Sequence, residues 1–303
     1  MTSPEAETWE PATAEDLVAD ALALGVPKAS PRMITDWTEH GLLGSPAFQK
    51  STRHGSDARL YSPDQRRLFT EMLKARLRSP LARVPHHTLI RPVLHMWLID
   101  DVVIPDSQAR RAWRTWARSA GKNTAAKRSE IARKLVDQVA HPAAPYHQRR
   151  KAQLLIEQGE KARSPEWGKL YSALTEVCSP WPSPAGQRIE RAVEGPDFPV
   201  GIREVVSNMM LRQKVTRRLG NEEVSEPLLV EARAEHRRGR QWYEASRSYF
   251  QERAVNPETF AEPSDLEAQV IEQVDAFIQP LGHQLGLVQE VLAEARAFGS
   301  RTR

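Results

Sequence analysis

Apolar residues recur three or four positions apart along most of this chain, the spacing that places them on one face of a helix. The alternation of apolar and polar residues typical of a half-buried strand is nearly confined to the short segment 59–62. The pattern therefore predicts a mainly α-helical protein. Beyond residue 100, we expect helices over 107–120, 124–139, 148–160, 167–177, 187–193, 202–219, 228–254 and 264–298.

Two other segments interrupt this periodicity. The run 89–104 is strongly apolar but too short and too interrupted to span a bilayer, so we expect it to form core. Segment 179–186 carries three prolines at alternate positions, which is typical of a linker.

The first 80 residues contain clear helix start and stop signals. Thr13 followed by Glu15 and Asp16 predicts a helix start, because a threonine can cap the chain and carboxylates favour the positive end of the helix dipole. Ser30 followed by Pro31 predicts a second helix, which Gly41 ends.

A polar loop over 49–57 and a short strand over 59–62 come next. Ser62-Pro63-Asp64 then predicts the cap of a third helix, which extends from Gln65 to about Arg78. The order of these elements is that of a helix-turn-helix followed by a wing.

These residues resemble the DNA-binding domain of MerR-type regulators. The resemblance rests on Arg32 in the second helix, Gly41-Leu42-Leu43 at its end, Arg59 and Tyr61 in the strand, and Ser62-Pro63-Asp64. Within the second helix, Thr35, Asp36 and Trp37 stand where the family has arginine, tyrosine and tyrosine. Excisionase-type proteins share this scaffold.

The resemblance implies that the second helix enters the major groove and that the wing meets the DNA backbone or the minor groove. An arginine can contact guanine with two hydrogen bonds, and Asp36 can accept from cytosine or pair with Arg32. The alternative for Lys50 and Arg53 is that they belong to a solvated loop and do not contact DNA. The expected DNA-binding residues are Ser30, Arg32, Met33, Thr35, Asp36, Lys50, Arg53, His54, Arg59 and Tyr61.

Charge is unevenly distributed along the chain. The net charge of +4 is small, but segment 108–151 carries 12 Lys and Arg against 2 Asp and Glu, and 28–83 carries 11 against 5. Segment 255–303 reverses the balance, with 3 against 8. A basic first half favours a polyanionic partner, and the acidic end favours a separate assembly or regulatory part.

The most basic stretch, 110–118, interleaves four arginines with Trp113 and Trp116. This arrangement can hold phosphates and stack on bases. The alternative, which we favour, is that the two tryptophans lie three positions apart on a buried helix face.

The last helical stretch has a near-heptad apolar spacing, which buries one stripe in a coiled coil or a helical bundle. Both a homodimer and packing within the chain remain open, with packing within the chain favoured. Pro280 and Gly282 predict a kinked helix or a helical hairpin. The stripe consists of Leu266, Val270, Val274, Phe277, Leu281, Leu285, Val288 and Leu292.

Several classes of function lack a signal in this sequence. Cys178 is the only cysteine, which excludes an intramolecular disulfide and a Cys-rich zinc site. The histidines form no metal-binding spacing, and no phosphate loop or catalytic pattern is present, so we expect no metal, no cofactor and no enzymatic activity. No segment predicts a membrane span or a signal peptide, so the expected location is the cytoplasm.

Together these features predict a flexible tail (1–12), a winged helix-turn-helix domain (13–83), a basic helical domain (84–178), the Pro-rich linker (179–186) and a helical region (187–303). The last region would serve dimerisation or bind a small-molecule effector. The predicted function is a bacterial transcriptional regulator that binds double-stranded promoter or operator DNA as a dimer. The alternatives are an excisionase-like or architectural DNA-binding protein, and a helical adaptor that binds protein.

Overall fold

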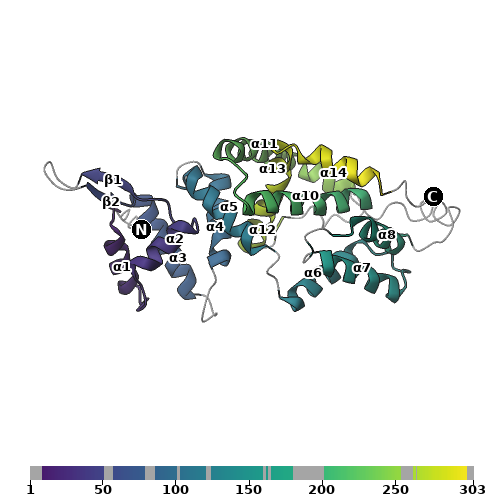
Figure 1. The fold of residues 1–303 in the computed structure, drawn as a ribbon, viewed down its shortest axis with the longest axis horizontal. Coiled ribbons are helices and arrows are strands. Elements are labelled where there is room, and N and C mark those ends of the chain that lie inside the picture. Colours follow the sequence, from purple (N-terminus) through teal and green to yellow (C-terminus); the bar gives the residue numbers. More distant parts are fainter. Residues whose placement is uncertain are drawn as a thin grey trace. The chain divides into compact units, whose positions relative to one another are not determined.

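The chain is mainly helical, as the pattern of apolar positions predicts (Figure 1). A computed structural model describes residues 9–50, 57–78, 86–100, 103–120, 124–159, 162, 165–179, 201–253, 262–263 and 265–298. The chain divides into two compact units. The first comprises residues 1–118, 218–237 and 265–276, and the second comprises 119–217, 238–264 and 277–303.

The first unit begins with two helices, a hairpin and a third helix. Their bounds are α1 (Ala14–Ala23), α2 (Pro31–Glu39), β1 (Ala47–Lys50), β2 (Asp57–Leu60) and α3 (Pro63–Arg78). The strands are antiparallel, with Ala47 opposite Leu60 and Lys50 opposite Asp57. Two backbone hydrogen bonds between Ala12 and Tyr61 tie the segment before α1 to the chain that leaves β2.

The predicted caps are present. The Thr13 hydroxyl accepts from the Asp16 amide at 3.1 Å, and the Asp16 carboxylate accepts from the Thr13 amide at 2.8 Å, which satisfies two donors that a helix leaves free. Ser30 caps α2 by accepting from the Met33 amide, and Pro31 occupies the first helical position. The Ser62 hydroxyl accepts from the Gln65 amide at 3.3 Å at the start of α3.

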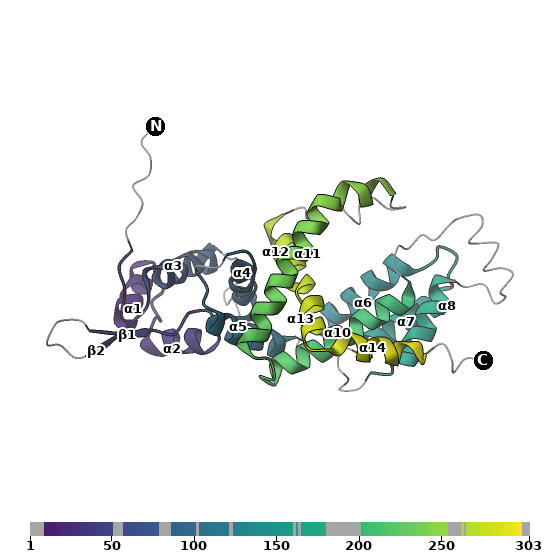
Figure 2. The same ribbon diagram turned by 90° about the horizontal axis from the view of Figure 1, so that it is seen from above.

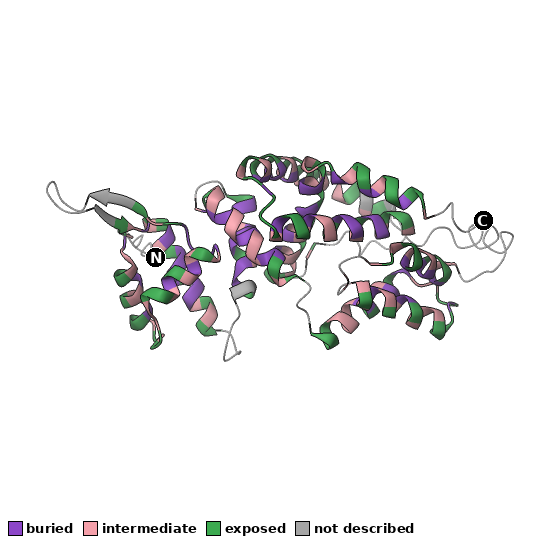
Figure 3. Ribbon diagram, viewed as in Figure 1, coloured by how far each residue is buried: buried purple, intermediate pink, exposed green. Residues whose placement is uncertain are grey.

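Aromatic packing and one ion pair join these helices. Trp37 of α2 and Phe69 of α3 are fully buried and meet edge to face, with ring centroids 5.2 Å apart. The Arg66 guanidinium of α3 donates to both carboxylate oxygens of Asp20 in α1, at 2.7 and 2.9 Å. Exposed residues, green in Figure 3, cover the other sides of the same helices.

The rest of the first unit includes α4 (His86–Ile99), α5 (Asp106–Ser119) and α12 (Leu266–Ala276). The apolar run expected to form core does so, because Leu89 to Leu98 contribute six buried apolar side chains to α4. The helix continues through Pro92 and ends at Ile99. Helix α12 packs against α4.

The second unit contains α6 (Ala125–Val139), α7 (Tyr146–Gly159) and α8 (Trp167–Cys178), which pack against one another. It also holds α13 (Ile278–Gln284) and α14 (Leu287–Arg296). The helices α10 (Ile202–Gly220) and α11 (Glu226–Arg253) contribute residues to both units, and α11 is one long helix (Figure 2). The predicted helix 187–193 and residues 180–186 of the predicted linker lie outside the described residues.

The C-terminal stretch is interrupted, as its proline and glycine predict. Pro280 lies in the first turn of α13, where its missing N–H costs no hydrogen bond, whereas a continuous helix would need that N–H to reach Ala276. Gly282 faces Leu211 of α10 so closely that an added Cβ would lie 2.6 Å from its Cδ1.

The apolar stripe of this stretch is buried within the chain over its middle. Val274, Phe277 and Leu281 are fully covered, whereas Leu266 at the start is 68% exposed. Beyond the interruption, the predicted positions Leu285, Val288 and Leu292 are half-buried, and α14 buries Leu287, Val291 and Ala295 instead. Packing within the chain, which the sequence favours, thus accounts for the middle of the stripe. The homodimer stays a prediction.

Candidate nucleic-acid interface

Helix α2 has one buried and one exposed face. Ile34 and Trp37 are fully buried, whereas Arg32, Thr35 and Glu39 are exposed. This separation follows from the helical period, since 32, 35 and 39 share a face that 34 and 37 do not. Among the other predicted contact residues of α2, Ser30, Met33 and Asp36 are half-buried.

The N-terminal end of α2 is suited to an anion. Its first turn carries no acidic residue, in contrast to α1, whose first turn holds Glu15 and Asp16. Lys28 and Arg32 are exposed on either side of the cap. The partial positive charge of the helix end is therefore reinforced by two cations instead of being neutralised.

The hairpin follows α2 as the predicted wing does. Lys50 ends β1 opposite Asp57, and Arg59 is an exposed residue of β2 opposite Phe48. The predicted contact residues Arg53 and His54 lie outside the described residues. The structure therefore places Arg59 in the hairpin but does not describe the tip.

Tyr61, one of the expected DNA-binding residues, is buried in the structure. Its side chain is 5% exposed, and its hydroxyl lies 3.1 Å from Thr38 Oγ1. The Thr38 hydroxyl donates to the Ile34 carbonyl oxygen at 2.9 Å, so the proton between the two hydroxyls comes from Tyr61. Tyr61 thus attaches the hairpin to α2.

Helix α5 caps the C-terminal end of α2. Its residues Gln108, Arg111, Arg114 and Thr115 donate to every backbone carbonyl from 38 to 43. A helix end normally leaves its last carbonyls without partners within the helix. Here the Trp37 carbonyl oxygen accepts from the amides of Leu42 and Leu43, and α5 supplies donors to the carbonyls that follow it. Arg111 Nε lies 2.8 Å from the Thr38 carbonyl oxygen, and Arg111 Nη2 lies 3.4 Å from that of Leu43. Arg114 Nη2 and Thr115 Oγ1 each lie 2.9 Å from their acceptors, the carbonyl oxygens of Glu39 and His40. Gln108 Nε2 lies 3.3 and 3.1 Å from the carbonyl oxygens of Gly41 and Leu42.

A buried pair of amides extends this contact to α3. The Gln65 amide nitrogen donates to the Gln108 side-chain oxygen at 2.9 Å and to the Val103 carbonyl oxygen at 2.9 Å. The Gln65 side-chain oxygen accepts from the Gly44 amide at 2.6 Å. The chain that follows α2, the helix α3 and the helix α5 are therefore joined by one polar network.

A carboxylate holds two of the α5 arginines in place. Glu222, in the turn between α10 and α11, accepts from Arg114 at 3.0 Å and from Arg118 at 3.2 Å. The hydrogen bond from Arg114 is the largest of the effects that lower the pKa of the Glu222 carboxyl group. Burial lowers the pKa of Arg111, whose donors serve backbone carbonyls.

These contacts decide between the two interpretations of segment 110–118. Trp113 is fully buried and Trp116 is 4% exposed, which confirms the core interpretation. The four arginines donate to backbone carbonyls or to Glu222. Sequence reasoning missed this role, although Gln108, Arg111 and Thr115 share one face of a predicted helix.

Comparisons with protein-family models, with curated proteins and with solved structures found no match to this chain. Over the residues that the structure describes, no helix combines the length and apolar character needed to cross a membrane. The same residues contain no group of three or more His, Cys, Asp or Glu side chains arranged to hold a metal ion.

Proposed function

We propose that this protein binds double-stranded DNA through the exposed face of α2 and the β1–β2 hairpin, and that it regulates transcription. The observation that carries the proposal is the N-terminal half of α2. There, Arg32 and Thr35 are exposed beside a helix end without acidic residues, while Ile34 and Trp37 anchor the opposite face.

The proposed docking places the N-terminal half of α2 in the major groove. Arg32 would read a base edge, Thr35 would contact a neighbouring base or phosphate, and Asp36 would accept from cytosine or pair with Arg32. The amides at the start of α2, beside Lys28, would approach a phosphate. Arg59 and Lys50 would bring positive charge to the backbone next to the groove.

Rigid placement of α2 supports sequence reading. Base recognition depends on holding side chains within fractions of an ångström of their partners. The caps that α5 supplies fix the C-terminal end of α2, and the aromatic contact with Phe69 fixes its buried face. In this proposal α5 is part of the DNA-binding body.

If the protein regulates transcription as a dimer, its two copies of α2 would contact the two half-sites of one operator. The buried part of the C-terminal stripe serves the chain's own core, so a second copy would have to use another surface. We propose both the regulation of a promoter and the formation of a dimer.

The test measures the affinity of the parent protein and of the Arg32→Ala and Arg59→Ala variants for two kinds of fluorescently labelled DNA. One is a duplex of random sequence, and the other is a duplex that the parent protein selects from a random pool. Arg32→Ala should weaken binding to the selected duplex by about tenfold or more, because a base contact is worth roughly 1–3 kcal/mol. Arg59→Ala should weaken binding to all duplexes alike and reduce the slope of log affinity against log salt by about 1.

Arg133→Ala is the matched control, since Arg133 is an exposed arginine of α6 in the second unit. It should leave both affinities unchanged. Equal effects of Arg32→Ala and Arg133→Ala on every duplex would contradict the assignment of α2. No binding to any DNA would favour the adaptor alternative.

A further inference from the structure

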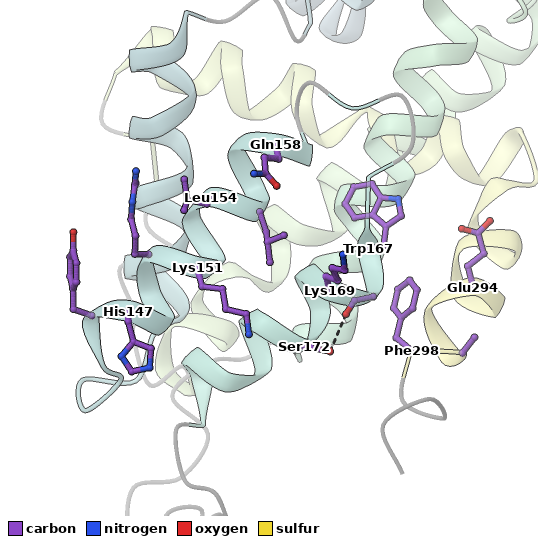
Figure 4. Close-up of a pocket in the computed structure, with 14 residues that line it drawn as sticks. His147, Lys151, Leu154, Gln158, Trp167, Lys169, Ser172, Glu294 and Phe298 are labelled. Carbon is purple, nitrogen blue, oxygen red and sulfur yellow. Dashed lines mark hydrogen bonds between the residues drawn. The ribbon is translucent and has the colours of Figure 1, made fainter.

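The second unit contains a large groove whose lining is unlike that of the proposed DNA interface. It has a volume of about 1130 Å³ and lies between α7, α8 and the end of α14. Its lining is mainly apolar, with Leu154, Leu155, Trp167 and Phe298 among the residues that form it (Figure 4). A groove of this size is large enough for a small organic molecule.

Apolar and basic residues lie together on both sides of the groove. Figure 4 shows Trp167, Lys169 and Phe298 toward one side and His147, Lys151 and Leu154 toward the other. The Phe298 ring also lies against Tyr171, at 5.9 Å between centroids. Each side thus combines apolar surface with a lysine.

The charge of the lining is positive. Three cations, Arg150, Lys151 and Lys169, face one carboxylate, Glu294. That carboxylate is already bound to Lys214 of α10 at 2.5 Å, so it is neutralised from outside the lining. The three lining cations also have carboxylate partners outside the lining, Arg150 with Glu157 at 3.7 Å among them. An anion in the groove therefore competes with these glutamates for the cations.

The groove cations are held by exchangeable partners. Lys151 pairs with Glu176 at 2.9 Å and Lys169 pairs with Glu166 at 2.7 Å, and all four side chains are at least 45% exposed. Exposed pairs of this kind contribute little to stability, so an anionic ligand that also contacts the apolar lining can displace the paired glutamates.

We propose that this groove binds a small amphipathic anion, with its apolar body against the leucine and aromatic residues of the lining and its anionic group at one of the two lysines, Lys151 or Lys169. The proposal does not depend on DNA binding. It follows from the apolar volume and from the excess of cations over carboxylates in the lining.

Two dyes that differ in charge test the proposal on the full chain. Anilinonaphthalene sulfonate carries an anionic group, and phenylnaphthylamine has the same aromatic body without it. The sulfonate should bind with an affinity about tenfold higher, because its charge adds a charge-assisted hydrogen bond to a lysine of the lining. Fluorescence titration measures both affinities.

Two double variants locate the effect. Lys151→Ala/Lys169→Ala should abolish most of the advantage of the sulfonate and leave phenylnaphthylamine binding unchanged. Lys127→Ala/Lys134→Ala is the matched control, because it removes two exposed lysines of α6 that likewise pair with a carboxylate, Glu130. It should change neither affinity.

Contact of the dye body with the apolar lining is tested with Leu154→Glu, which places a carboxylate on an exposed groove residue. Both dyes should then bind more weakly. Equal affinity of the two dyes, equal effects of the two double variants, or no dye binding at all would overturn the proposal.

Discussion

Single residues set the geometry at the end of α2, and Gly41 is the most constrained of them. Its φ of +80° is a left-handed conformation that glycine adopts at little cost, and a Cβ at this position would overlap the backbone of Ala112 in α5. The close approach that brings the α5 side chains to the α2 carbonyls therefore depends on the missing side chain.

Gly41→Ala should lower the free energy of unfolding by about 2–4 kcal/mol, which combines left-handed strain with overpacking. Urea denaturation followed by circular dichroism measures this change. Gly239→Ala is the control, because Gly239 lies within α11 with open space around it. That variant should be more stable by about 0.5–1 kcal/mol, and an equal destabilisation of both proteins would contradict the account of Gly41.

Glu222 makes the α5 arginines sensitive to pH. Its pKa is lowered in the folded protein, so its contribution to stability is present above the unfolded-state pKa and is lost as the pH falls through the folded-state pKa. Glu222→Gln should therefore lower the melting temperature at neutral pH, and the difference from the parent protein should shrink below about pH 4.

Thermal melts at several pH values check this prediction. Glu231→Gln is the control, because Glu231 is an exposed glutamate of α11. If the difference in melting temperature between Glu222→Gln and the parent protein does not change with pH, the charge of the Glu222 carboxylate does not contribute to stability.

At the scale of elements, local signals predicted most of the helices. Thr13, Ser30 and Ser62 marked helix starts, and Pro280 marked the interruption near the C-terminus, because caps and prolines act within one turn of their own position. Pro92 is the exception, since α4 continues through it with its apolar side chains buried on either side.

The cap on α2 could not be predicted in this way. Its donors lie about 70 residues further along the chain than its acceptors, and the acceptors are backbone carbonyls, which every sequence contains. The basic composition of 110–118 therefore indicated a polyanion as readily as a neighbouring helix end. Within this stretch, only the burial of Trp113 and Trp116 was predictable, from their spacing on one helix face.

Gln108→Met tests the polar network between α2, α3 and α5. Methionine keeps the length of the side chain but leaves the Gly41 and Leu42 carbonyls and the Gln65 amide without this partner. We expect a loss of about 2–4 kcal/mol in the free energy of unfolding, because buried polar groups lose their hydrogen bonds.

Gln289→Met in α14 is the matched control, since Gln289 is exposed. It should change the stability by less than about 0.5 kcal/mol. Denaturant titration of both variants gives the comparison, and a Gln108→Met protein as stable as the control would contradict the importance of the network.

At the scale of the whole molecule, the two compact units combine segments that are distant in the sequence. The first unit joins residues 1–118 to 218–237 and 265–276, through contacts such as those of Glu222 with Arg114 and of α12 with α4. The sequence indicated successive regions along the chain, because composition and periodicity describe neighbours in sequence and carry no information about such pairings.

The two proposals of binding involve different units and different chemistry. DNA binding uses the exposed face of α2 and the hairpin in the first unit, and the amphipathic anion uses the groove in the second. Each can therefore fail without the other. A regulator that responds to a small molecule would require both.

The most direct measurement of the central claim is selection of bound sequences from a random double-stranded DNA pool at two salt concentrations. We expect an enriched motif that persists at the higher salt concentration and is lost with Arg32→Ala. The reason is that base contacts by α2 add to the affinity from contacts with the DNA backbone, which depend on salt. Binding without an enriched motif would contradict sequence reading by α2, and no binding at either salt concentration would contradict the DNA-binding function itself.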